Sequence, residues 1–146
     1  MKAFTLTAVA ALAVAAAGVS ASGAAAKTTR HLSLTSVGAQ VAPNESAYEV
    51  HGTRRGALIQ IVHTDPTGTA GTSTSTFYDG HGTIHGRQTF TLSQPDETGI
   101  ITIAGRGRLV SGTGTYKGIV GSYTLTGTFN TKTTMTRVKV TGSETY

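Results

Sequence analysis

The amino-acid sequence predicts an all-β fold: a small, closed antiparallel β-barrel of about eight strands, preceded by a cleavable signal peptide. Between residues 119 and 129, apolar residues and glycines alternate with mostly hydroxylated ones, which is the pattern of a strand with one buried face. Gly121 and Gly127 lie on the apolar face, as suits a strand that bends sharply around a small interior. No segment of the remaining chain shows the 3.6-residue period of an amphipathic helix, so an antiparallel meander is favoured over βαβ units.

The first 26 residues have the plan of a secretory signal peptide. Lys2 gives a positive start, an Ala/Val/Leu-rich run covers residues 4–19, and small residues lead up to Ala26. Cleavage is expected after Ala26, with cleavage after Ala21 as the competing site. The apolar run is shorter than the roughly 20 residues that a spanning helix needs. We therefore expect a secreted protein with no membrane span after cleavage, in which residues 27–146 form a single β-barrel domain.

The composition limits how this domain is stabilised and what it binds. The chain contains no cysteine, so packing alone must hold the fold, which is compatible with a bacterial exported protein. Its formal net charge is +5, one less once the predicted cleavage removes Lys2. So mild an excess is typical of a solvated surface rather than of a nucleic-acid interface, and no nucleic-acid partner is expected.

Seven segments are predicted as strands, because each is rich in β-branched or aromatic residues and is bounded by Gly, Pro or Asp clusters. They cover residues 48–50, 57–63, 73–78, 83–93, 99–110, 116–130 and 133–141. Consecutive segments follow at turn-length spacing, which indicates that neighbours in sequence pair in the sheet. The low-complexity stretch at residues 64–76 is predicted to be a loop, at a barrel mouth or as a connector. Closure into a barrel is favoured over a sandwich, because it leaves no edge strand.

The alternation within the long segments predicts which residues face the interior. A barrel of about eight strands is either filled by side chains or holds one small ligand. The predicted ligand-binding residues are Gln88, Phe90, Ile101, Ile103, Leu109, Tyr123, Leu125 and Phe129. Gln88 and Tyr123 are the polar groups of this otherwise apolar set, so we expect them to orient the ligand.

Two stretches resemble a known family. The first, GTGTYKGIVGSYTLTGT at residues 112–128, is similar to the late-strand signature of the allene oxide cyclase and dirigent-like barrels. The second, FYDGHGTIHGRQTF at residues 77–90, is similar to the Asp-Gly hairpin and following strand of small secreted barrels of that kind.

The resemblance implies a small antiparallel barrel with a hydrophobic cavity, and enzymes that guide the cyclisation or coupling of reactive apolar intermediates. It also implies an acidic residue and an Asn near the cavity, and Glu49 and Asn44 lie in the corresponding general region. Members often form homo-oligomers. Streptavidin-like and lipocalin-like barrels are less well matched, because both depend on tryptophan and this chain has none.

Few residues are candidates for catalysis or metal binding. Among the 7 carboxylates, only Glu49 falls inside a predicted strand. It faces outward if Tyr48 and Val50 face inward; in the opposite register it enters the cavity as a desolvated acid or base. Asp79 and His81 are the candidate metal ligands, but the ordinary interpretation of this segment is a tight hairpin turn, and no metal or other cofactor is expected.

Three functions are compatible with these features. The first is binding of a small apolar ligand in the barrel interior, without catalysis. The second is a cyclase or isomerase acting on an apolar intermediate, which a carboxylate or amide in the cavity would favour. The third is binding of an extracellular surface or polyanion through an outward basic stripe. That stripe consists of Arg87, Arg106, Arg108, Arg137 and Lys139.

Overall fold

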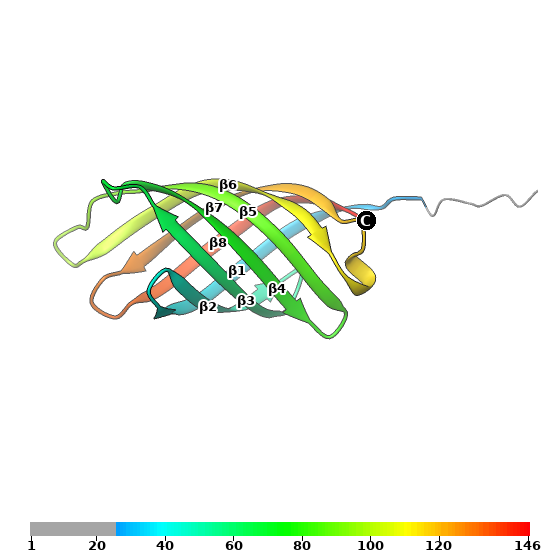
Figure 1. Cartoon of the computed structure of the whole chain (residues 1–146), viewed down its shortest axis with the longest axis horizontal. Helices are drawn as coiled ribbons and strands as arrows, with labels where there is room; N and C mark the ends of the chain where they lie inside the picture. Colours follow the sequence, from blue (N-terminus) through cyan, green and yellow to red (C-terminus); the bar gives the residue numbers. More distant parts are fainter. Residues whose placement is uncertain (1–25) are drawn as a thin grey trace, which may run out of the picture.

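In the computed structural model, which describes residues 26–146, the chain forms one closed antiparallel barrel (Figure 1). Each strand pairs with the next in sequence, and β1 pairs with β8 to close the sheet. The elements are β1 (Thr29–Ala42), β2 (Glu45–Gly52), β3 (Gly56–Thr64), β4 (Ala70–Asp79), β5 (Gly82–Leu92), β6 (Ile100–Gly112), η1 (Gly114–Tyr116), β7 (Val120–Asn130) and β8 (Met135–Thr145). The predicted closed barrel of about eight strands is therefore confirmed. The predicted signal segment lies outside the described residues, except for Ala26.

Three differences from the sequence-based strands stand out. The predicted strand at residues 116–130 is wrong over its first four residues, because Tyr116 ends the 3₁₀ turn η1 and β7 begins only at Val120. The strand β1 was not predicted, because its inward face carries Ser36 and Gly38 while its outward face carries Val37 and Ala39, which obscures the alternation. The predicted loop at residues 64–76 is wrong over its second half, where β4 begins at Ala70. Threonine and serine are favourable strand residues when a strand has one solvated face.

The turn between β3 and β4 is short and ordered around one carboxylate. Asp65 accepts hydrogen bonds from the backbone N–H groups of Thr69 and Ala70 and from the Thr67 hydroxyl. These bonds outweigh the effect of desolvation and lower the pKa of Asp65 below its ordinary value. A low-complexity sequence is here compatible with a defined turn, because Asp and Thr bond to nearby backbone groups.

The two ends of the barrel differ. At the end that holds the C-terminus, on the right in Figure 1, the connection between β6 and β7 folds back as the 3₁₀ turn η1. Here Tyr116 and Ile119 pack against Val50, Phe77 and Ile84 in a buried apolar cluster, with Ile119 only 1% exposed. We call this the terminal end and the opposite one the far end. The turn η1 is the one helical element within residues 26–146, and no helix there is long and apolar enough to cross a membrane.

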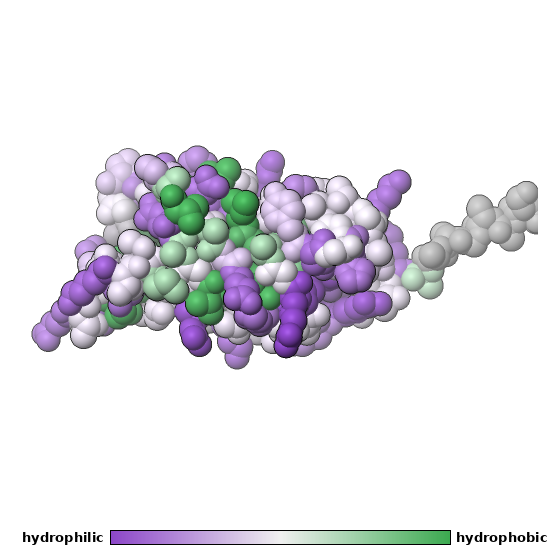
Figure 2. All heavy atoms as spheres, turned by 90° about the horizontal axis from the view of Figure 1, so that it is seen from below, coloured by the Kyte–Doolittle hydropathy of each residue, from purple (hydrophilic) through white to green (hydrophobic). Residues whose placement is uncertain are grey.

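The outer surface is also uneven. On the side of β2 and β3, Figure 2 shows hydrophobic side chains gathered among hydrophilic ones. Ile59 and Ile61 are the outward residues of β3, at 39% and 46% exposure. The apolar run at residues 57–63 therefore has apolar residues on both faces of one strand.

Glycines on the inward face let neighbouring strands coil closely around the interior. A Cβ atom on Gly127 would lie 2.3 Å from the carbonyl oxygen of Arg137 and 2.9 Å from the Cα of Val138. These are backbone atoms that cannot move without disturbing the pairing of β7 with β8. The glycine supplies close approach between strands, as its place on the apolar face predicts.

We expect Gly127→Ala to lower the free energy of unfolding by about 1–3 kcal/mol, the usual cost of forcing an extra carbon into a packed site. Gly80→Ala is the matched control, because nothing lies within 4 Å of the added Cβ there. Urea unfolding followed by circular dichroism measures both. Equal stabilities of the two variants would contradict the close-approach argument.

Candidate functional site

The barrel encloses an elongated cavity of about 370 Å³. This volume is within the range of small-molecule sites, roughly 300–1,000 Å³. Its wall is mostly aliphatic and aromatic. At the far end the lining includes the exposed residues Gln40, Asn44 and Thr64, so the cavity opens to solvent there. At the terminal end it stops at Phe77, Ile84 and a buried ion pair.

A belt of polar side chains crosses one wall at mid-height. The hydroxyl of Tyr123 donates a hydrogen bond to Gln88 Oε1 at 2.8 Å, and Ser75 Oγ donates to the same oxygen at 3.4 Å. Beside them, Gln60 Nε2 donates to Ser73 Oγ at 2.8 Å. Desolvation raises the pKa of Tyr123 to about 12, although the Ser75 hydroxyl opposes the shift. Tyr123 is therefore a neutral hydrogen-bonding group at physiological pH.

The amide nitrogen of Gln88 can donate a hydrogen bond to a ligand. The amide oxygen accepts two of the three hydrogen bonds of the belt, and the nitrogen donates to no side chain or backbone group of residues 26–146. Within that same range no fully buried side-chain nitrogen or oxygen lacks a partner. The nitrogen must therefore be accessible from the cavity, where it offers one hydrogen bond to a carbonyl or hydroxyl oxygen.

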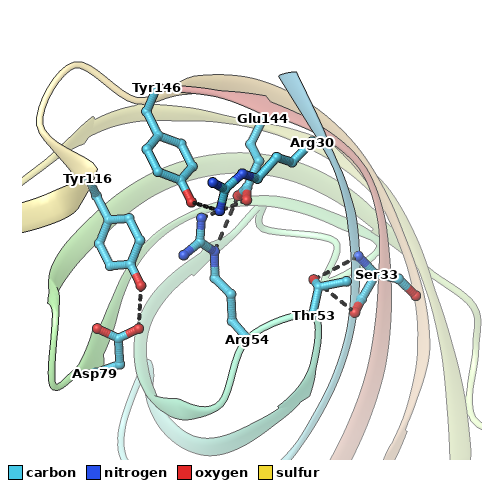
Figure 3. Close-up of polar contacts among 8 residues, drawn as sticks. All are labelled: Arg30, Ser33, Thr53, Arg54, Asp79, Tyr116, Glu144 and Tyr146. Carbon is cyan, nitrogen blue, oxygen red and sulfur yellow. Dashed lines mark hydrogen bonds and ion pairs between the residues drawn. The ribbon is translucent and has the colours of Figure 1, made fainter. Parts of the chain in front are cut away.

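An ion pair closes the terminal end (Figure 3). Arg54, from the β2–β3 connection, donates from Nη2 to Glu144 Oε1 at 2.6 Å and from Nε to Oε2 at 3.3 Å. The two side chains are only 8% and 4% exposed. The Arg54 guanidinium also lies over the Tyr116 ring, 4.2 Å from its centroid, and 5.4 Å from that of Tyr146. Arg30 donates to the Tyr146 hydroxyl at 2.9 Å, which completes the cluster.

The ion pair keeps the cavity electrically neutral. Burial alone lowers the pKa of Arg54, but the hydrogen bonds and charge of Glu144 outweigh it and raise the pKa above its ordinary value. Arg54 therefore stays charged, and the two side chains pair in a forked geometry. They are the charged side chains among the cavity-lining residues. A ligand inside thus meets no uncompensated charge.

Asp79 anchors the β6–β7 connection at the same end. Its carboxylate accepts the Tyr116 hydroxyl at 2.5 Å and the backbone N–H of His81 at 2.7 Å. Burial raises the pKa of Asp79, but these hydrogen bonds outweigh it, so that the pKa lies below its ordinary value. Figure 3 shows the Tyr116 hydroxyl directed at this carboxylate.

The structure places the predicted site residues as follows. The predicted ligand-binding residues Gln88, Phe90, Ile101, Ile103, Leu109, Tyr123, Leu125 and Phe129 all line the cavity. Tyr48 and Val50 face inward, so Glu49 faces solvent, with its side chain 74% exposed and 3.0 Å from His51 Nε2. Asn44 lies at the rim of the cavity.

The two candidate metal ligands lie close together in a hairpin turn. His81 Nδ1 is 3.7 Å from Asp79 Oδ1. Within the described part of the chain, no group of three or more His, Cys, Asp or Glu residues could hold a metal ion. Asp79 instead binds Tyr116 and the turn backbone.

Sequence reasoning missed the carboxylate that does face the interior. The prediction that Glu49 alone among the carboxylates lies inside a strand is wrong, because β8 continues to Thr145 and so includes Glu144. The signal was present: Glu144 continues the inward alternation of Val138, Val140 and Gly142. Its partner Arg54 lies in a connection outside any periodic segment, where alternation predicts nothing.

Arg54→Met is expected to destabilise the barrel by about 3–5 kcal/mol, because it leaves Glu144 buried without a counter-charge. The double variant Arg54→Met/Glu144→Leu removes both charges and should recover most of that loss. Urea unfolding of the wild type, both single variants and the double variant gives the coupling energy. Additive effects would contradict the pairing.

Tyr116→Phe should lower stability at pH 7 by about 1 kcal/mol, by removing a hydrogen bond to the Asp79 carboxylate while keeping the ring. Because the pKa of Asp79 is lowered on folding, its contribution is present above pH ~4 and is lost as pH falls through the lower, folded-state pKa. Thermal unfolding between pH 2 and 7 should show the two proteins converging at low pH. A difference that is independent of pH would contradict this account.

The chain matches no protein-family model, no curated protein and no solved structure. What the fold shows is an eight-stranded, closed antiparallel barrel, and the resemblance to allene oxide cyclase and dirigent-like barrels stays a prediction at the level of family and activity.

Proposed function

We propose that this protein binds a small, uncharged, largely apolar molecule in the barrel interior and carries it without chemical change. The observation that supports this most directly is the accessible amide nitrogen of Gln88 in a mostly apolar cavity. Together with the predicted signal peptide, it suggests a secreted carrier.

The chemistry of the cavity defines the class of ligand. A ligand with one carbonyl or hydroxyl oxygen at mid-length can accept a hydrogen bond from Gln88, while its apolar parts contact residues such as Leu125 and Phe90. A fatty acid or another anion is disfavoured, because the one lining cation, Arg54, is already paired with Glu144. Transfer of an unpaired charge into such a site is costly. Terpenoid-like ketones and alcohols have the required properties.

The residues at the open end of the cavity indicate where a ligand enters. Gln40, Asn44 and Thr64 are exposed at the far end, whereas Tyr116 and Ile119 seal the terminal end with their apolar cluster. Entry is therefore expected between the connections β1–β2 and β3–β4.

The cyclase or isomerase alternative gains no comparable support. An acid or base for such a reaction would have to face the cavity, and Glu144, the lining carboxylate, is held by two hydrogen bonds from Arg54. Glu49 faces solvent.

The test uses β-ionone, a neutral terpenoid ketone, and decanoate, an apolar anion, as probes. We expect β-ionone to bind and to perturb tyrosine fluorescence, and decanoate to bind at least about tenfold more weakly. The variant Gln88→Leu/Tyr123→Phe should lower the affinity for β-ionone about tenfold, the value of one lost hydrogen bond of about 1.4 kcal/mol. Replacing Tyr123 together with Gln88 avoids leaving the Tyr123 hydroxyl without its acceptor, and only the longer hydrogen bond from Ser75, at 3.4 Å, is lost besides.

Two further variants locate the binding. Leu125→Trp fills the cavity and should abolish binding, while Thr124→Val changes the neighbouring outward residue and should leave it unchanged. Native mass spectrometry of protein purified from its own host should detect a neutral apolar compound. Tighter binding of decanoate than of β-ionone, or equal effects of the two variants, would overturn the proposal.

A further inference from the structure

The outer wall of the barrel opposite to β1–β3 carries a regular array of arginines and hydroxyls. The register aligns outward residues of consecutive strands into two adjacent rows. One row is Thr74, Arg87, Arg108, Ser122 and Ser143, and the other is Thr72, Thr89, Arg106, Thr124 and Thr141. Together they line a shallow groove across β4–β8, and His63 of β3, opposite Thr72, lies at one end of it. We call these two rows the basic face.

The three arginines of the basic face lie close together without carboxylate partners. Arg87 and Arg108 are directly opposite each other in the ladder, and Arg106 is two residues from Arg108 on the same side of β6. Opposite positions place Cβ atoms about 4.5–5.5 Å apart, and alternate residues of a strand lie about 7 Å apart. Among residues 26–146 none of the three forms an ion pair or a side-chain hydrogen bond.

In the absence of a bound anion, the close arginines of the basic face destabilise the folded protein. Like charges directly opposite each other in a sheet are destabilising, and no residue of either row is acidic. Spaced surface charges that only keep a barrel soluble have no need to face one another. An external anion placed between the guanidinium groups would turn the repulsion into charge-assisted hydrogen bonds.

Only part of the predicted basic stripe belongs to the basic face. Arg137 and Lys139 are also exposed, but they pair with Thr128 and Thr126 of β7, outside the two rows, and β1 lies on their other side. They are not part of the groove.

We propose that the basic face binds an acidic polysaccharide, with its carboxylate or sulfate groups on Arg87, Arg106 and Arg108 and its sugar hydroxyls on the surrounding Thr and Ser side chains. The hydroxyls both donate and accept, as sugar hydroxyls do. The shallow groove runs across five strands, which suits a linear chain.

Other polyanions fit these residues less well. The two rows hold no Phe, Tyr or Trp side chain, and His63 at the end of the groove offers a single ring, whereas a single-stranded nucleic acid stacks successive bases on several. They hold no large apolar side chain to enter a membrane surface. Duplex DNA binding usually engages many more cations than three.

The test compares two triple variants of equal charge. The basic-face variant is Arg87→Gln/Arg106→Gln/Arg108→Gln, and the control is Arg55→Gln/Arg137→Gln/Lys139→Gln, which changes exposed residues elsewhere. The probe is a heparin octasaccharide in about 0.15 M salt, with neutral dextran as the uncharged reference. We expect the basic-face variant to lose at least about tenfold in affinity and the control less than about threefold.

A second measurement guards against a variant that is merely misfolded. Without ligand, the basic-face variant should melt no lower than the wild type, because repulsion between arginines is removed. Heparin octasaccharide should raise the melting temperature of the wild type and of the control variant, but not that of the basic-face variant.

Equal losses in the two variants would overturn the proposal, because net charge alone would then explain binding. Stronger binding of a duplex DNA of matched charge, or of vesicles containing anionic lipid, would also overturn it. None of these outcomes would affect the interior site, because the ligand expected to bind there, β-ionone, is uncharged.

Discussion

The structure depends on closure of the sheet by the pairing of β1 with β8. Once the ring is closed, every backbone group between neighbouring strands has a partner and the two-residue period assigns each side chain to the interior or to water. Closure around so small a lumen brings backbones close together, and inward glycines such as Gly127 permit it. The interior holds one packed apolar cluster beneath η1 at the terminal end and a second around Leu32, Phe90 and Leu125, and the second cluster forms part of the cavity wall.

Most polar groups of the interior already have an ion-pair or hydrogen-bond partner within the protein. Arg54 and Glu144 neutralise each other beside the rings of Tyr116 and Tyr146, and the hydroxyl of Tyr123 is satisfied by Gln88. A buried ion pair of this kind contributes little net stability relative to apolar residues, but it is costly to break. Its consequence here is selectivity: an anionic ligand has no free cation to meet, and the accessible amide nitrogen is the group that remains to orient a neutral one.

The sequence was sufficient wherever alternation was uninterrupted. From Thr83 to Phe129 apolar and hydroxylated residues alternate clearly, so the inward positions of Gln88, Ile103 and Tyr123 could be predicted. The sequence was insufficient for β1, because the inward face of that strand is partly polar. It was also insufficient for the end of β8, because this strand continues beyond its last apolar residue, through Gly142 to Glu144. Arg54 could not be predicted, because its position depends on the fold bringing a connection over the end of the barrel.

The two proposed sites lie on opposite faces of the same strands of the barrel. Along β5 the outward Arg87 precedes the inward Gln88, and along β7 Ser122 and Thr124 flank the inward Tyr123. Because successive side chains point to opposite faces, a substitution at one position leaves the chemistry of the other face unchanged. Coupling between the sites would require the backbone of β5–β7 to shift, and the hydrogen-bonded pairing of β5 with β6 and of β6 with β7 opposes such a shift. The two proposed binding sites are therefore expected to act independently of each other.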